Sequence, residues 1–251
     1  MRLIEVLDLK KYYASGLINK EYTKAVDGVS FHIEPGETLG LVGESGCGKT
    51  TVGRLLLRLI EPTSGSIFFD GTDLTKLDRG DMRAVRPRMQ MIFQDPESSL
   101  NPRMRIGESI AEPFRLGLRG KISRSEMREK VLELVDIVGL NPEHVNRFPY
   151  QLSGGQNQRV VLARILAVNP EFIVADEPTA SLDVSVQAQI LRLMMDLKRE
   201  FGLTMLFISH DMEVMRHMSD RIAVMEKGKI VNILDNKSYS TAGVAPNPVS
   251  I

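Results

Sequence analysis

The sequence is short of cysteine, of net charge and of long hydrophobic runs. Cys47 is the one cysteine among 251 residues, which excludes an internal disulfide and is typical of a reducing compartment. Lysine plus arginine and aspartate plus glutamate each number 32, so the charge balance gives no reason to expect a nucleic-acid partner. The chain has no internal repeat and no low-complexity segment, and its length suffices to bury a sizeable core.

Membrane-spanning and secretory patterns are missing as well. The stretch that comes nearest to a membrane helix, residues 160–168, is short and is broken by Arg164. Residues 1–8 carry acids and lack the basic and then apolar layout of a signal peptide. We therefore expect a chain that cannot cross a bilayer alone, so that any channel it serves must be formed by other chains.

What the sequence does contain is an alternation of strand-like and helix-like segments, which predicts an α/β fold. Strands are expected over residues 1–7, 29–33, 38–42, 66–69, 89–93, 172–175 and 204–208, with a hairpin over 222–225 and 230–233. Helices are expected over 50–60, after a capping box of Ser123 and Glu126, and over 153–168 and 184–200. The first helix should bury Leu55, Leu56 and Leu59 on one face.

Residues 95–150 differ from the rest because strand signals vanish there. We interpret them as a helical subdomain inserted between two halves of one core, residues 1–94 and 151–235. Residues 236–251 are polar, with glycine and proline, and are expected to form a loose tail. The whole chain, residues 1–251, is thus interpreted as a single domain with a helical insert.

A glycine-rich loop follows the expected strand 38–42. Residues 43–50, Gly-Glu-Ser-Gly-Cys-Gly-Lys-Thr, fit the phosphate-loop pattern G-x-x-x-x-G-K-[ST]. Glycine allows successive backbone N–H groups to point at phosphates, while Lys49 adds a positive charge and Thr50 offers a hydroxyl to Mg²⁺. A chance match would arise in roughly one chain of this length in a hundred, and the flanking strand and helix lower those odds.

Two acids end the expected strand 172–175. Asp176 and Glu177 would lie at the carboxyl end of a buried strand, where ligands bind in α/β sheets. Asp176 is a candidate to hold Mg²⁺ through water, and Glu177 is a candidate to orient and deprotonate an attacking water. In a sequence without other motifs, such a pair would be two solvated loop acids about half of the time. Because a phosphate loop precedes the pair here, a role in metal binding and catalysis is the stronger interpretation.

A third motif, Leu-Ser-Gly-Gly-Gln at residues 152–156, stands before an expected helix. Its free N–H groups and the positive helix end can bind a phosphate, although Ser153 would also serve as an ordinary N-cap. The order of the three motifs resembles that of the ATP-binding-cassette (ABC) ATPases, and the resemblance covers nearly the whole chain. One departure is Asn157, where such proteins usually carry Gln, Arg or Lys; we expect this change to tune activity rather than abolish it.

The resemblance implies a P-loop NTPase fold, with a RecA-like mixed sheet, flanking helices, an N-terminal antiparallel β-subdomain and an α-helical subdomain. It also implies that the Ser-Gly-Gly segment of one subunit closes on the ATP of another, so that the active unit is a dimer. The segment of Ser181, Leu182 and Asp183 matches the one that crosses the dimer interface, and its alternative is another helix cap.

The resemblance assigns roles residue by residue. It implies a catalytic set of Glu177, His210, Lys49 and Gln94, in which His210 contacts the γ-phosphate and Gln94 contacts Mg²⁺ or the attacking water. It implies the metal ligands Thr50, Gln94 and Asp176. The residues expected to contact ATP are Tyr12, Gly43, Glu44, Ser45, Gly46, Cys47, Gly48, Lys49, Thr50, Thr51, Ser153, Gly154, Gly155, Gln156 and Asp183.

Two tyrosines compete for the adenine ring. Tyr12 is the best match to the aromatic residue that stacks on adenine in this family, and Tyr13 is a close rival because the loop between Tyr13 and Val29 is long. The long loop expected at 14–23 also suits the oligopeptide, dipeptide and nickel importer branch. Packing at the end of a strand is the structural alternative for either ring, with a chance of about one in three.

Three longer strings point to one branch of the family. Residues 42–51, 93–103 and 180–190 resemble the oligopeptide, dipeptide and nickel importer ATPases beyond what nucleotide chemistry requires. Such subunits usually continue into a C-terminal extension with a cysteine-rich segment and a His-Pro-Tyr stretch, and this sequence has neither. We therefore expect no dimerisation through such an extension.

The resemblance implies an ATPase that uses ATP and Mg²⁺ to energise an importer for peptides or nickel. Its first expected partner is a second ABC ATPase subunit, in a homodimer or in a heterodimer, and the branch favours the heterodimer. Two transmembrane permeases and, indirectly, an extracytoplasmic substrate-binding protein are the other expected partners. It would then lie at the cytoplasmic face of the cell membrane, as a peripheral subunit. The alternative is the ATPase of a soluble multi-enzyme machine such as that for phosphonates. A DNA-maintenance ATPase is disfavoured because no long coiled coil or zinc module separates the motifs.

Overall fold

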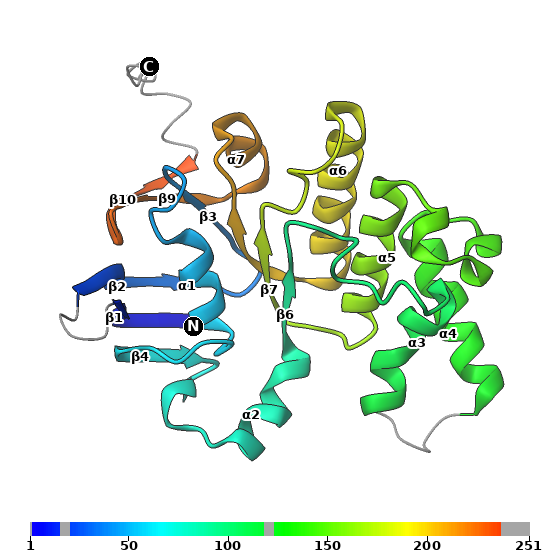
Figure 1. Ribbon diagram of the computed structural model, residues 1–251, viewed down its shortest axis with the longest axis horizontal. Helices are drawn as coiled ribbons and strands as arrows, with labels where there is room; N and C mark the ends of the chain where they lie inside the picture. Colours follow the sequence, from blue (N-terminus) through cyan, green and yellow to red (C-terminus); the bar gives the residue numbers. More distant parts are fainter. Residues whose placement is uncertain (1, 16–20, 118–122, 237–251) are drawn as a thin grey trace. The chain divides into compact units, whose positions relative to one another are not determined.

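The chain divides into two units in the computed structural model (Figure 1), which describes residues 2–15, 21–117 and 123–236. The first unit comprises the described parts of residues 1–75 and 206–251, and the second comprises the described parts of residues 76–205. The loose tail expected at 236–251 lies, except for residue 236, outside the described residues.

An antiparallel sheet forms one part of the first unit. Its strand order is β2-β1-β4-β5, from β1 (Ile4–Ser15), β2 (Glu21–Ile33), β4 (Ser64–Phe69) and β5 (Thr72–Asp73). The strands predicted at 1–7 and 29–33 were too short, because β1 and β2 continue as a paired ribbon through part of the loop expected at 14–23. Apart from the buried Leu9 and Val26, the extension is mostly polar, charged or tyrosine, so it lacks the regular apolar alternation by which a half-buried strand is recognised.

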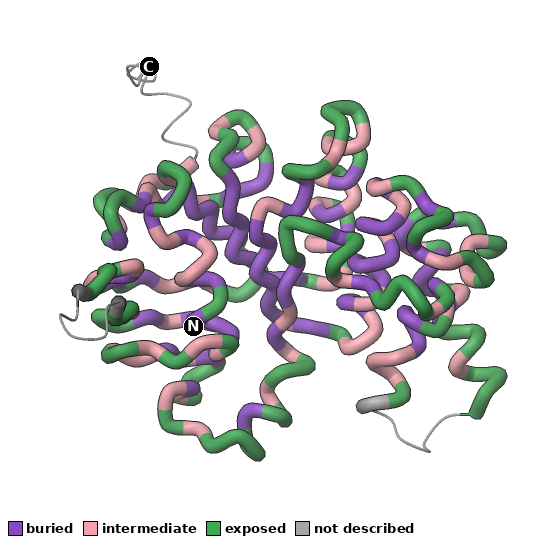
Figure 2. The backbone as a smooth tube through the Cα atoms, in the orientation of Figure 1, coloured by how far each residue is buried: buried purple, intermediate pink, exposed green. Residues whose placement is uncertain are grey.

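Parallel strand pairing forms the other part of the first unit. β3 (Thr38–Val42) pairs in parallel with β9 (Arg221–Glu226), and β9 pairs antiparallel with β10 (Lys229–Asp235). Every residue of β3 is buried, which explains its continuous apolar sequence (Figure 2). The helices α1 (Lys49–Leu56) and α7 (Met212–Met218) belong to the same unit.

Helix α1 is shorter than the sequence predicted. It ends at Leu56 in a Schellman-type turn, in which Leu59 N donates to Arg54 O at 2.9 Å and Arg58 N donates to Leu55 O at 2.9 Å. Arg58 takes the left-handed conformation that this turn requires, with φ +45°. The reversal leaves Leu59 45% exposed, so the prediction that it shares the buried face with Leu55 and Leu56 was wrong.

The second unit combines a parallel strand pair with most of the helices. β6 (Met89–Ile92) pairs in parallel with β7 (Phe172–Asp176). The helical elements are α2 (Arg79–Val85), α3 (Ile106–Gly117), α4 (Arg124–Ile137), α5 (Gly154–Leu166) and α6 (Val184–Phe201), with 3-10 turns η2 (Arg86–Arg88), η3 (Pro142–Asn146) and η4 (Pro149–Gln151). The chain passes between the units in η1 (Leu74–Lys76) and β8 (Thr204–Ile208). The predicted capping box of Ser123 and Glu126 is present at the start of α4.

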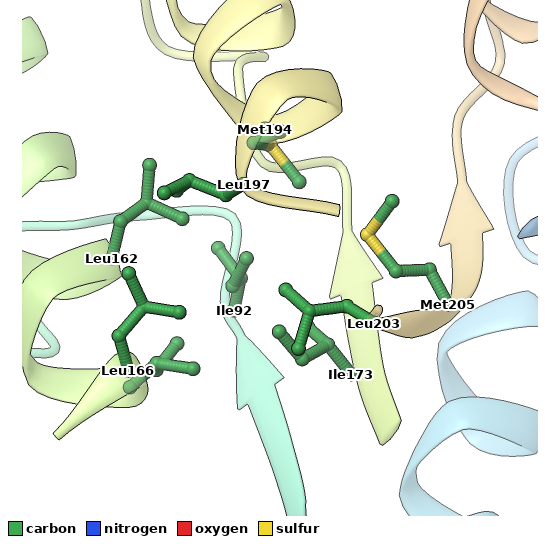
Figure 3. Close-up of a pocket in the computed structure, with 9 residues that line it drawn as sticks. Ile92, Leu162, Leu166, Ile173, Met194, Leu197, Leu203 and Met205 are labelled. Atoms are coloured by element: carbon green, nitrogen blue, oxygen red, sulfur yellow. The ribbon is translucent and has the colours of Figure 1, made fainter. Parts of the chain in front are cut away.

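A narrow hollow lies in the core of the second unit (Figure 3). Side chains from β6, β7, α5 and α6, from the start of β8 and from the residue before it line the hollow. All of them are aliphatic or methionine: Ile92, Leu162, Ile165, Leu166, Ile173, Met194, Leu197, Leu203 and Met205. Because no polar group points into it, it is a packing imperfection of the core and not a site for a charged ligand.

Candidate functional site

Two glycines of the phosphate loop, Gly43 and Gly48, are required by close contacts within the first unit. A Cβ on Gly43 would lie 2.1 Å from the carbonyl oxygen of Met225, and one on Gly48 would lie 2.1 Å from that of Ala25. Gly48 also has φ +112°, which side chains disfavour. The loop is therefore seated on neighbouring backbone, and its path depends on both glycines.

The start of helix α1 is open to an anion. Its N-cap is Gly48, which has no side chain to accept a hydrogen bond from the first turn. The first-turn N–H groups and the helix dipole favour a phosphate at this end. Lys49, the first residue of the helix, is only 6% exposed, and its ammonium donates to the carbonyl oxygens of Gly43 at 2.7 Å and Glu44 at 2.9 Å. The predicted phosphate-binding cation thus lies inside the loop, held by hydrogen bonds to neutral carbonyl oxygens that negatively charged phosphate oxygens can replace.

The two candidate tyrosines have different surroundings in the first unit. The hydroxyl of Tyr12 donates a short hydrogen bond to Asp27, and the ammonium of Lys24 lies 5.4 Å from the ring centre. Tyr13 is 45% exposed, with the Lys11 ammonium 5.0 Å from its ring centre. The hydrogen bond to Asp27 raises the pKa of Tyr12, and the same bond, followed by the nearby Lys24, lowers the pKa of Asp27.

His210 lies between β8 and α7 in the first unit and is exposed. Asp211 is the N-cap of α7 and accepts from the N–H groups of Glu213 at 2.8 Å and Val214 at 3.2 Å. The helix cap therefore fixes the backbone directly after His210.

The second unit brings Gln94 and Glu177 together. Gln94 follows β6 and Glu177 follows β7, and the amide Nε2 of Gln94 donates to Oε2 of Glu177 at 3.4 Å. Glu177 has φ +47°, a left-handed conformation that is uncommon for a residue with a side chain. Such outliers are frequently maintained at functional sites. The hydroxyl of Ser181 donates to the carbonyl oxygen of Gln94 at 3.5 Å, so the segment after β7 also contacts the residue after β6.

Asp176 ends β7 and is 7% exposed. Among the described residues there is no cluster of three or more His, Cys, Asp or Glu side chains that could hold a metal ion. Mg²⁺ binds proteins through one or two side chains and completes its shell with substrate phosphates and water. Asp176 in the second unit and Thr50 in the first unit each carry an oxygen donor of the kind that Mg²⁺ prefers.

The Ser-Gly-Gly motif begins helix α5, and both interpretations of Ser153 remain compatible with it. Ser153 Oγ accepts from Gln156 N at 3.3 Å, while Gln156 Oε1 accepts from Ser153 N at 3.0 Å, which is a capping box. A Cβ on Gly155 would lie 2.4 Å from Cγ1 of Val186, and one on Gly154 would lie 3.0 Å from Cδ2 of Leu182. The glycines therefore allow the start of α6 and the residues before it to pack closely on the motif.

Two further residues near the motif differ in burial. Asn157 is fully buried and donates through Nδ2 to the carbonyl oxygen of Pro149 at 3.1 Å, so the departure from the family pattern occurs at a packing position. Asp183 is exposed, and although it is the N-cap of α6 its side chain caps no N–H group. The alternative of an ordinary side-chain cap at Asp183 is therefore not realised.

Sequence reasoning missed several contacts of these residues. Asp27 was not a candidate. It lies 15 residues from Tyr12 and on a different strand, so no local sequence motif contains both residues. Val186 was missed for the same reason, since its contact with Gly155 joins α5 and α6. The left-handed φ of Glu177 has no signal in the sequence either, because glycine, which usually marks this conformation, is absent there.

Comparisons with known proteins agree on one family. Residues 26–180 match the family model described as ABC transporter. The oligopeptide transport ATP-binding protein AppF of Bacillus subtilis (strain 168) is 50% identical over 236 residues, which cover 92% of this chain and 71% of that protein. The dipeptide transport ATP-binding protein DppF of Escherichia coli (strain K12) is 47% identical over 232 residues, covering 91% of this chain and 69% of that protein.

Solved structures agree with the sequence comparisons. A dimeric post-hydrolysis state of the ATP-binding cassette MJ0796 bound to ADP and Pi superposes with a TM-score of 0.83 at 32% identity, covering 93% of this chain and 98% of that one. CbiO1 from Clostridium perfringens, part of an ABC transporter complex, gives a TM-score of 0.83 at 25% identity, covering 96% of this chain and 91% of that one.

The fold and the motifs thus define a P-loop NTPase of the cassette type. The chain belongs to the ABC transporter family. The resemblance to the peptide-importer branch and the expected fold class are both confirmed. The division into core residues 1–94 and 151–235 and a helical subdomain 95–150 stays a prediction. No helix within the described ranges has the length and hydrophobicity to span a membrane.

Proposed function

We propose that this chain is the ATP-binding and ATP-hydrolysing subunit of a transporter that imports peptides. The observation that carries the proposal is the identity of about half of all residues, over more than nine-tenths of the chain, with proteins named for oligopeptide and dipeptide transport. The buried Lys49 inside a glycine loop and the glycine N-cap of α1 support a phosphate site of the kind that such a subunit needs.

Catalysis would depend on position and charge. Lys49 and the first turn of α1 stabilise charge on the phosphate oxygens, since phosphoryl transfer requires electrostatic stabilisation more than covalent chemistry. Glu177 accepts a proton from the attacking water, and Gln94, already 3.4 Å from its carboxylate, orients that water with it. His210 contacts the γ-phosphate and senses its presence.

Mg²⁺ is the metal that fits these donors. Thr50 would offer its hydroxyl and Asp176 its buried carboxylate, the latter through water, with Gln94 as a further oxygen donor. When bound, Mg²⁺ neutralises charge on the phosphate oxygens.

The Ser-Gly-Gly motif would serve a second subunit. Ser153, Gly154, Gly155 and Gln156 form a helix start that can receive the phosphate of a partner's ATP, and the uncommitted side chain of Asp183 can contact the partner. The active unit is then a dimer of ATPase subunits, of like or related chains. Two membrane permeases and, indirectly, a substrate-binding protein complete the transporter, and the chain lies at the cytoplasmic face of the cell membrane.

A pull-down of the tagged chain from its native membranes in mild detergent tests this function. The expected result is copurification of two multi-span permeases, with or without a second ATPase. A peptide-binding protein bound to these permeases is expected as well. Recovery of soluble enzyme subunits alone would overturn the transporter assignment and favour a soluble multi-enzyme machine. A nickel-binding partner would keep the transporter and change its substrate.

A further inference from the structure

The hydroxyl of Tyr12 is held by a carboxylate that also contacts one lysine on its own strand and one lysine on a third strand. Its hydroxyl donates to Oδ1 of Asp27, which lies across the β1–β2 ribbon. The ammonium groups of Lys24 and Lys229 lie 3.6 and 3.7 Å from Oδ2 of the same carboxylate. The Asp27 side chain is only 16% exposed, so these interactions are partly shielded from water.

The backbone of Asp27 is tied to the phosphate loop. Its N–H donates to the carbonyl oxygen of Gly228 at 2.8 Å, and the N–H of Gly228 donates to the carbonyl oxygen of Cys47 at 3.0 Å. Cys47 precedes Gly48, the N-cap of α1, whose Cα lies against the carbonyl of Ala25. Two backbone hydrogen bonds therefore link the loop that receives phosphates to the residue that holds the aromatic ring.

We propose that Asp27 is a positioning residue for the nucleotide base, which holds the Tyr12 ring at a fixed place relative to the phosphate loop so that adenine can stack on it. The inference rests on the proposed function, in which Tyr12 stacks on the adenine of ATP. A ring that is ordered before binding loses less rotational freedom when the base arrives. The raised pKa of Tyr12 keeps the proton on the phenol, and the lowered pKa of Asp27 keeps it an acceptor, so the hydrogen bond has one direction at neutral pH.

Tyr13 lacks these constraints. Successive side chains of a strand point to opposite faces, so Tyr13 cannot share the contact with Asp27. Tyr13 is 45% exposed, and the ammonium of Lys11, on the same strand, lies 5.0 Å from its ring centre. The hydrogen bond thus distinguishes two neighbouring tyrosines that the sequence left as rivals.

Binding of two ligands to the purified full chain tests the proposal. The non-hydrolysable ATP analogue AMP-PNP, with Mg²⁺, contains the base, whereas inorganic tripolyphosphate contains only the phosphates. We expect Tyr12→Phe and Asp27→Ala each to weaken AMP-PNP binding about 3- to 10-fold, the range that ordering of one side chain implies. Tripolyphosphate binding should be unchanged, and the double variant should be no weaker than either single variant.

Two control variants distinguish loss of the Tyr12–Asp27 hydrogen bond from a general effect of substitution on folding. Asp27→Asn keeps an acceptor oxygen for the phenol and should retain most of the AMP-PNP affinity, even if Asp27→Ala folds poorly. Tyr22→Phe removes a phenol hydroxyl from β2, where Tyr22 is 59% exposed, and should leave both affinities unchanged. Calorimetric titration measures both ligands on the same preparation.

The outcomes distinguish the positioning role of Asp27 from the stacking of adenine on Tyr12. If Tyr12→Phe binds AMP-PNP as the parent does while Tyr12→Ala binds it weakly, the role of Asp27 is overturned and the stacking role of Tyr12 stands. If Tyr12→Ala has no effect, or Tyr13→Ala has the larger one, the proposed adenine contact itself fails. If Asp27→Ala weakens tripolyphosphate as much as AMP-PNP, Asp27 supports the loop and not the base, which also overturns the inference.

Discussion

Glu177 shows how a single residue combines a candidate catalytic role with an unfavourable backbone. Its φ of +47° lies in the left-handed region, where a Cβ approaches the following carbonyl oxygen. The conformation places the carboxylate 3.4 Å from the amide of Gln94. We infer that the left-handed backbone at Glu177 lowers the free energy of unfolding and orients the side chain that activates water.

This inference predicts that glycine at position 177 gives a more stable protein than alanine does, the reverse of their usual order. Glu177→Gly should unfold with a free energy about 1 kcal/mol larger than Glu177→Ala, because only glycine relieves the left-handed strain. Both variants should lose ATP hydrolysis by about 10²- to 10⁴-fold, as expected for a lost general base. Urea denaturation without nucleotide and a phosphate-release assay measure the two effects.

A helical position is the control for that comparison. Gln189 is exposed within α6, where Gln189→Gly should be less stable than Gln189→Ala by about 1 kcal/mol. Equal stability of the two Glu177 variants, against this difference at Gln189, would show that residue 177 is not strained.

At the scale of elements, the start of α5 depends on its contact with the start of α6. Gly155 leaves room for the Cγ1 of Val186, which would lie 2.4 Å from a Cβ at residue 155. Arg164, in the last turn of α5, donates to the carbonyl oxygen of Ser99 at 2.9 Å and to Glu112 at 2.6 Å, so α5 is also bound to α3 and to the segment after Gln94. The helix that begins with the Ser-Gly-Gly motif is therefore constrained at both ends.

The contact between α5 and α6 predicts a coupled pair of substitutions. Gly155→Ala should lower the free energy of unfolding by about 1–3 kcal/mol, because the added methyl group overlaps Val186. Val186→Ala in the same chain should recover most of that loss, which a double-mutant cycle of urea denaturation curves measures. The control is Gly154→Ala, whose Cβ would meet only the end of the flexible Leu182 side chain, and which should not couple to Val186→Ala. Additive effects of Gly155→Ala and Val186→Ala would contradict the packing explanation.

At the scale of the whole molecule, the proposed function requires more than one chain. The motif at α5 begins a helix whose positive end can accept a phosphate, while the chain's own phosphate loop precedes a different helix, α1. The solved relative MJ0796 is a dimer in its state with ADP and Pi. A composite site between two subunits is consistent with both observations.

We therefore expect ATP to drive association when hydrolysis is blocked. Glu177→Gln with ATP and Mg²⁺ should sediment as a dimer, whereas the same variant with ADP should sediment as a monomer, because only ATP presents a γ-phosphate to the partner's helix. Adding Lys49→Ala to Glu177→Gln removes a phosphate contact and should abolish the dimer. A monomer in ATP would contradict a homodimer and would direct the search to a second, related ATPase.

Local chemistry explains what could be predicted from the sequence. The phosphate loop, the two acids after an apolar strand and the Ser-Gly-Gly motif are contiguous, so spacing along the chain fixes their relation to a helix start or a strand end. The buried strands β3 and β8 were predicted with the limits that the structure has, since their continuous apolar residues carry a strong signal. The polar ribbon of β1 and β2 was underestimated because backbone pairing, not apolar alternation, maintains it.

The sequence by itself determined the family, the identity of the candidate site residues and the order of the elements that carry them. Only the tertiary structure decided which side chains meet across elements: Tyr12 with Asp27, Gln94 with Glu177, and Gly155 with Val186. It also decided that Glu177 is left-handed and that Leu59 is exposed. The physical reason is that these contacts depend on register, on helix ends and on packing distances of a few ångströms, which no local pattern of residue types encodes.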